Sequence, residues 1–166
     1  SSHLFDQLGM PMIEEVSQEN GRFYVRLPEG KLEAHLVAEG LRKLASLKYL
    51  IDNGSLQPGG ILLWDEPETN LNPRIIPHVA KFLCRLAALN VQIFIATHDF
   101  LLSQELSLIG EYEKNAQLKF FSLYKSEHSA GVLVESGNVI TELKNNAILE
   151  EFAGHYDREA ELFAAS

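Results

Sequence analysis

The chain has 166 residues, of which 46% are hydrophobic and 22% are charged, which is enough for one globular domain with a buried core. Its formal net charge of −9 gives no overall attraction to the phosphates of nucleic acid, and leaves only a local basic patch for such binding. The single cysteine, Cys84, excludes an internal disulfide and a cysteine-based zinc site. Apolar stretches are too short to cross a membrane and no signal peptide opens the chain, so we expect a cytoplasmic protein without a membrane segment.

The first predicted elements are a strand and a long helix. Few periodic signals precede residue 22, and alternating apolar residues then predict a strand at Arg22–Leu27. Apolar residues at three- and four-residue steps predict a helix from about His35 to Asp52. Asn53-Gly54 is a typical C-terminal stop for such a helix.

Two apolar runs without alternation follow, Ile61–Trp64 and Val91–Ala96. Such runs predict strands that are covered on both faces, as in a parallel sheet. Between them, Asn72 is expected to cap a helix that has Pro73 at its first position and ends near Leu89. Strand, helix and strand together predict a βαβ unit with a parallel crossover.

The remainder of the chain predicts two helices around an antiparallel strand pair. We expect a helix at Phe100–Leu108, strands at Leu118–Lys125 and Gly131–Glu135, and a helix from Asn146 to about Phe163. Gly154 is a candidate break in that last helix. The fold class is therefore expected to be α/β.

Polar residues follow both of the predicted buried strands. Asp65-Glu66 ends the first, and Thr97-His98-Asp99 ends the second. Ligands of parallel sheets gather at the carboxyl ends of the strands. A rigidly held carboxylate suits a hard cation such as Mg²⁺, which makes Asp65 a candidate metal ligand, and Glu66 beside it is a candidate general base. The plainer interpretation is a solvated acidic turn.

The segment from Asp65 to Pro73 reads Asp-Glu-Pro-Glu-Thr-Asn-Leu-Asn-Pro, and it resembles the Walker B strand end and D-loop of ABC-type P-loop ATPases. These residues are most similar to the corresponding segment in the branch that contains the overcoming-lysogenization-defect (OLD) proteins and AAA-type ATP-binding proteins of bacterial defence. Ala96-Thr97-His98-Asp99 resembles the H-loop of that family. The resemblance implies ATP and Mg²⁺ as cofactors, with Asp65 serving the metal, Glu66 the attacking water and His98 the γ-phosphate. Asn72, in the place of the D-loop acid, would contact a partner subunit.

The segment Val37–Lys43 resembles the signature motif of the same family. There, a serine hydroxyl and glycine amides at a helix start bind the γ-phosphate held by the opposite subunit, as helix N-termini bind anions. Ala38, Glu39 and Gly40 occupy the corresponding positions, so the serine hydroxyl is missing. An amphipathic helix that merely contains a glycine is the alternative.

No Gly-x-x-x-x-Gly-Lys-Ser/Thr phosphate loop occurs in the printed sequence. We therefore expect residues 1–166 to be a single partial domain, the C-terminal half of an ABC-type P-loop NTPase fold with a mainly parallel sheet and flanking helices. The full-length protein would hydrolyse ATP to ADP and phosphate as a homodimer closed over nucleotide, and this part alone would be inactive. Two alternatives stay open: a nucleotide-gated, non-catalytic interaction module, and the nucleotide-binding subunit of a transporter. An effector or nucleic acid is compatible with the sequence, although no motif indicates one.

Overall fold

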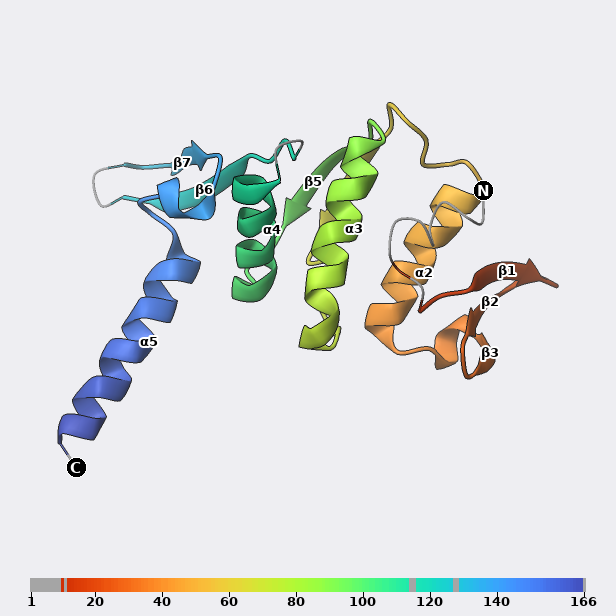
Figure 1. Ribbon diagram of the computed structural model, residues 1–166, viewed down its shortest axis with the longest axis horizontal. Coiled ribbons are helices and arrows are strands. Elements are labelled where there is room, and N and C mark those ends of the chain that lie inside the picture. Colours follow the sequence, from red (N-terminus) through yellow and green to blue (C-terminus); the bar gives the residue numbers. More distant parts are fainter. Residues whose placement is uncertain (1–9, 11, 114–115, 127–128, 166) are drawn as a thin grey trace. The chain divides into compact units, whose positions relative to one another are not determined.

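The computed structural model describes residues 10, 12–113, 116–126 and 129–165. The chain divides into two compact units, and the boundary between them lies between Thr97 and His98. Figure 1 traces the helices and strands along the chain. Within the described ranges, no helix has the length and apolarity that a membrane span requires. The elements of each unit are given separately below.

The first unit begins with an antiparallel sheet of three strands, β1 (Glu15–Glu19), β2 (Arg22–Leu27) and β3 (Gly30–Glu33). The predicted strand at Arg22–Leu27 is confirmed with its bounds. β1 and β3 were not predicted, because they are short and their own residues carry little apolar alternation. Pairing with β2 on both sides makes them strands.

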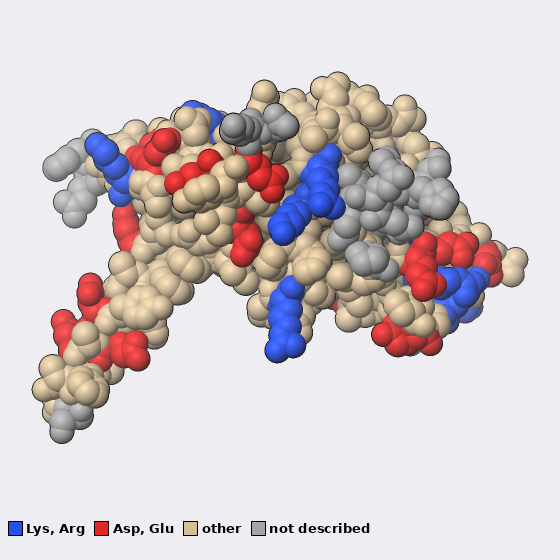
Figure 2. Space-filling model, in the orientation of Figure 1, with Lys and Arg blue, Asp and Glu red and all other residues tan. Residues whose placement is uncertain are grey.

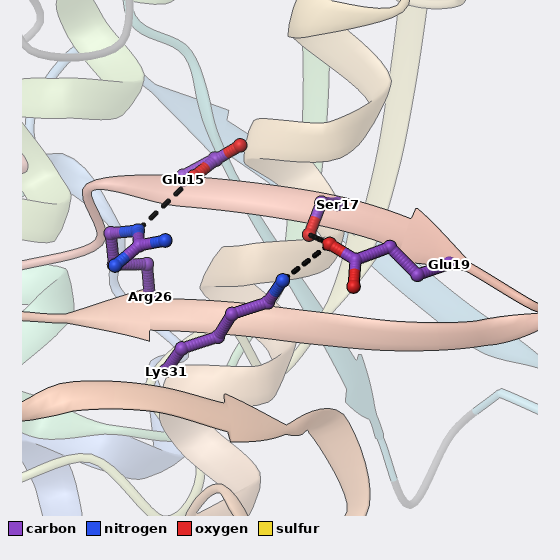
Figure 3. Close-up of polar contacts among 5 residues, drawn as sticks. All are labelled: Glu15, Ser17, Glu19, Arg26 and Lys31. Atoms are coloured by element: carbon purple, nitrogen blue, oxygen red, sulfur yellow. Dashed lines mark hydrogen bonds and ion pairs between the residues drawn. The ribbon is translucent and has the colours of Figure 1, made fainter.

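One face of this sheet carries charged side chains that form ion pairs between strands (Figure 3). Arg26 Nε donates to Glu15 Oε2 across the β1–β2 pair, at 3.1 Å. Lys31 of β3 reaches over β2 to the carboxylate of Glu19, which also accepts from Ser17 Oγ at 3.4 Å. The hydrogen bond from Lys31 lowers the pKa of Glu19. The polar face is therefore solvated, and the opposite face, with Val25, turns to the core.

The helix α2 (Glu39–Asp52) starts four residues later than predicted. Ala34–Leu36 form a separate 3₁₀ turn, η1, and Val37 and Ala38 then have extended ψ angles of 139° and 140°. The side chain of Val37 is buried in the core. Its burial holds the chain extended and places the start of the α-helix at Glu39.

The predicted βαβ unit is confirmed: β4 (Ile61–Asp65) and β5 (Gln92–Ala96) pair in parallel, and α3 (Ile76–Ala88) connects them after the 3₁₀ turn η2 (Pro73–Ile75). The expectation that both strand faces are covered is wrong. One face, with Trp64, packs against the core. The other leaves Ile61, Leu63 and Phe94 exposed by 62%, 76% and 50%. Apolar runs alone therefore do not reveal whether one face of the strand pair or both are covered.

The second unit contains α4 (Phe100–Tyr112), the antiparallel pair β6 (Phe120–Lys125) and β7 (Val132–Gly137), the 3₁₀ turn η3 (Ile140–Glu142) and α5 (Ala147–Ala164). The expected strand pair is confirmed, and α4 runs one turn beyond its predicted end. The α/β class is confirmed as well. Parallel pairing among the described residues is confined to β4 and β5, while the other two sheets are antiparallel.

Helix α5 continues through Gly154, so the candidate break is wrong. Asn146 caps it, with Oδ1 accepting from the amide of Ile148 at 3.0 Å. No residue of the helix is buried. Acidic side chains gather along its exposed surface, visible at the lower left of Figure 2.

Candidate active site

The candidate site is built where β4 ends. Asp65 is the last residue of β4 and lies opposite Ala96 in the parallel ladder. The next amide, of Glu66, donates to the carbonyl oxygen of Ala96 at 2.8 Å, which extends the ladder by one bond. Glu66 itself has φ 46°, a left-handed conformation that is uncommon for a residue with a long side chain. The backbone therefore changes direction between the two carboxylates.

Contacts from two segments hold Glu66 in this conformation. Lys43 Nζ, on α2, donates to the carbonyl oxygen of Glu66 at 3.1 Å. Thr69 Oγ1 donates to Glu66 Oε2 at 3.0 Å, and the Thr69 amide donates to the Glu66 carbonyl at 3.2 Å. Left-handed geometry costs a non-glycine residue about 1–2 kcal/mol, so it persists where surrounding contacts fix it. The carboxylate is thus positioned by the fold before any ligand arrives.

The predicted signature and D-loop segments lie against each other. Glu39 Oε2 accepts from Asn70 Nδ2 at 2.9 Å. A Cβ at Gly40 would be 2.5 Å from the carbonyl oxygen of Asn70 and 2.6 Å from Leu71 Cδ2. The glycine is therefore required by close packing of α2 on the loop after β4, independently of any nucleotide.

Ala38 is the N-cap of α2, and no side chain caps the helix start among the described residues. Its methyl group supplies neither a cap nor a hydroxyl donor. What this end of the helix can offer an anion is its backbone amides and dipole.

Asn72 is confirmed as a cap, since its Oδ1 accepts from the amide of Arg74 at 3.0 Å at the start of η2. A contact of Asn72 with a partner subunit stays a prediction.

His98 is the first residue of the second unit. Within that unit it lines an open cavity of about 520 Å³, together with Phe100, Phe152, His155 and other residues of α5. Phe100 and Phe152 stack with ring centroids 3.7 Å apart.

The carboxylates fit a metal that is shared with a nucleotide. Among the described residues, no group of three or more histidine, cysteine or acidic side chains could enclose a metal ion. Mg²⁺ at nucleotide sites takes one or two carboxylates, with phosphate oxygens and waters completing its shell. Asp65, fixed at a strand end, fits the role of one carboxylate ligand among phosphate oxygens and waters. It does not fit a metal site made of protein ligands alone.

Three contacts of the site were not foreseen from the sequence: Lys43 on the carbonyl of Glu66, Glu39 with Asn70, and Thr97 with Glu68. Each joins segments that are more than 20 residues apart. From the sequence, the residues Glu68-Thr69-Asn70 indicated only a resemblance to one branch of the family. The local contact of Thr69 with Glu66, three residues apart, could have been inferred from the turn spacing.

Solved structures show the same fold. One, from work on ATP-driven dimerization and DNA stimulated activation of SMC ATPases, matches with a TM-score of 0.57 and 14% identity, covering 91% of this chain and 94% of that chain. Another, an Smc head domain with an extended coiled coil bound to the C-terminal domain of ScpA, derived from Pyrococcus furiosus, matches with a TM-score of 0.57 and 18% identity. This second match covers 92% of this chain and 36% of that chain. At such low identities the likeness shows the fold alone, which this chain shares with the head domains of SMC ATPases.

A search of curated proteins gave no match. A family model described as "AAA domain, putative AbiEii toxin, Type IV TA system" matches residues 4–103, which is more than half of the chain. The matched range contains α2, the parallel strands β4 and β5, and the candidate carboxylates Asp65 and Glu66. The chain therefore belongs to this AAA-domain family of P-loop ATPases.

Proposed function

We propose that this chain supplies the metal ligand and the water-activating base of an enzyme that hydrolyses ATP to ADP and phosphate. The observation that carries the proposal is the position of Glu66, held at the end of β4 by Ala96, Lys43 and Thr69. A carboxylate fixed in this way can accept a proton from an attacking water without first reorganising. Asp65 would hold Mg²⁺, which neutralises phosphate charge when bound.

His98 would complete the γ-phosphate contacts by donating a hydrogen bond to a phosphate oxygen, as either a neutral or a protonated imidazole can. It follows β5 by two residues, and β5 pairs with the strand that carries Asp65. The role rests on the H-loop resemblance.

A longer protein would provide the phosphate loop. The exposed face of β4 and β5, with Ile61, Leu63 and Phe94, supports this part of the proposal. Parallel strands are ordinarily covered on both faces, and clustered exposed apolar side chains mark a surface that another segment buries. The missing nucleotide-binding part would pack there, and the chain described above would be inactive alone.

Closure over nucleotide would require a second copy. The uncapped start of α2 would present amides to the γ-phosphate held by the partner, with Gly40 allowing the helix to sit on the D-loop segment. Because Ala38 lacks a hydroxyl, this contact would be weaker by one hydrogen bond, about 1 kcal/mol. The ATP-driven dimerization of the structurally similar SMC ATPase supports the arrangement.

Membership of the OLD and bacterial-defence branch is proposed on the residues Glu68-Thr69-Asn70 that follow Asp-Glu-Pro. Single-turnover hydrolysis separates this ATPase from a nucleotide-gated module that binds without cleaving. The loss of the signature serine at Ala38 is the feature that favours such a module.

The test is Glu66→Gln in the full-length protein, with Glu29→Gln, in an exposed turn, as the matched control. Removing the base should lower kcat by at least about 100-fold while ATP still binds, because general base catalysis contributes factors of that order. Size-exclusion chromatography with light scattering should then detect an ATP-trapped dimer. Unchanged hydrolysis by Glu66→Gln, or no hydrolysis by the unmodified full-length protein, would refute the proposal.

A further inference from the structure

Glu68 is a buried acid for which the proposed chemistry has no role. It lies two residues after Glu66 and is only 8% exposed. Its Oε1 accepts a hydrogen bond from Thr97 Oγ1 at 2.5 Å. Its Oε2 is buried and has no hydrogen-bond partner among the described residues.

Folding stability does not explain an acid at this position. A buried carboxylate loses its hydration, and an oxygen without a partner is not compensated for that loss. An apolar side chain of similar length, such as methionine, would fill the same space without this cost. An unsatisfied buried group in a native structure therefore calls for a functional explanation.

The hydrogen bond to Thr97 connects the two chain segments on which the proposed reaction depends. Glu68 and Thr69 are neighbours, and Thr69 Oγ1 holds the Glu66 carboxylate at 3.0 Å. Thr97 follows β5 and directly precedes His98 in the sequence. One turn thus fixes the candidate base through Thr69, and fixes the residue before His98 through Glu68.

We propose that Glu68 is a positioning residue: its hydrogen bond to Thr97 fixes the end of β5, which leads into His98 along the chain, against the turn that carries Glu66. The inference rests on the proposed ATPase function. Turnover then requires a carbonyl-type hydrogen-bond acceptor at residue 68 and a hydroxyl at residue 97. It does not require the negative charge of Glu68.

The experiment uses the full-length protein with five variants: Glu68→Met, Glu68→Gln, Thr97→Val, Thr97→Ser and the double change of Glu68→Met with Thr97→Val. Steady-state ATP hydrolysis gives kcat and KM, and thermal unfolding gives Tm. Glu68→Met removes the acceptor together with the unpaired oxygen. Glu68→Gln and Thr97→Ser keep the hydrogen bond.

Glu68→Met should lower kcat about tenfold, the factor that corresponds to one transition-state hydrogen bond lost by the residues that Glu68 positions, with KM nearly unchanged. Its Tm should stay the same or rise. Thr97→Val should lower both kcat and Tm, because it leaves the whole buried carboxylate unpaired. The double change should regain Tm while its kcat stays at the level of Glu68→Met. The two conservative variants should stay within about threefold of the unmodified kcat.

A merely structural role would make kcat follow Tm across the series, and it would overturn the inference. A normal kcat in Glu68→Met would overturn it as well. Glu66→Gln, measured alongside, separates failure of the positioning role from failure of the ATPase proposal. If Glu66→Gln abolishes hydrolysis while Glu68→Met keeps a normal kcat, the positioning role fails and the ATPase proposal stands. If Glu66→Gln is also active, the ATPase site itself is wrong.

Discussion

The close approach of α2 to the loop after β4 makes Gly40→Ala a decisive perturbation. An added Cβ would be 2.5 Å from the Asn70 carbonyl oxygen and 2.8 Å from its carbonyl carbon, so backbone rather than a flexible side chain must move. Overpacking costs about 1–3 kcal/mol, and a clash with backbone belongs at the upper end, about 2–3 kcal/mol; the better helix propensity of alanine returns about 1 kcal/mol. With a net loss of about 1–2 kcal/mol, Tm should fall by about 2–8 °C for a chain of this length.

Gly154→Ala in α5 is the matched control, because its Cβ would have only Arg158 Nη1 nearby, at an ordinary 3.5 Å. This variant keeps the propensity gain without the clash, so its Tm should be unchanged or higher. Thermal unfolding by circular dichroism measures both. Hydrogen exchange should also show faster exchange at the start of α2 in Gly40→Ala, where the contact of Glu39 with Asn70 is lost. Equal Tm values for the two variants would refute the packing explanation and return Gly40 to a purely ligand-binding role.

Two further predictions concern a cap and a charge pair. Asn72→Ala should destabilise the protein by about 1 kcal/mol, because the acceptor for the Arg74 amide is lost, whereas Asn72→Asp keeps that acceptor. Thermal unfolding of the two variants tests this. Equal losses of stability in both variants would rule out capping. The pKa of Glu19 is lowered, chiefly by the hydrogen bond from Lys31. Its stabilising contribution should therefore be present above the unfolded-state pKa and be lost as pH falls through the lower folded-state pKa. Lys31→Met should raise the pKa of Glu19 in an NMR titration of its carboxyl carbon, and a pKa that does not move would contradict the assignment.

The sequence alone predicted the elements whose signals are local. The βαβ unit follows from apolar runs separated by a helical pattern, and the cap Asn72 follows from its position before Pro73 at a helix start. Asp65 could be placed at a strand end for the same reason, because an apolar run that stops at two acids specifies both the strand and its polar edge. The position of Asp65 at a strand end was thus predicted from the sequence, and the catalytic roles of the site residues stay proposals.

Tertiary structure decided what depends on contacts between distant residues. Burial of Val37 moved the start of α2 to Glu39, and pairing with β2 created β1 and β3 from short polar segments. An apolar run reads the same whether one face or two are covered, so only the packed chain revealed that Leu63 is exposed. The conformation of Glu66, its contacts with Lys43 and Thr69, and the burial of Glu68 against Thr97 were decided at the same level. Sequence periodicity specifies which residues can face a core, whereas the hydrogen bonds that orient a site exist only after separate segments have packed together.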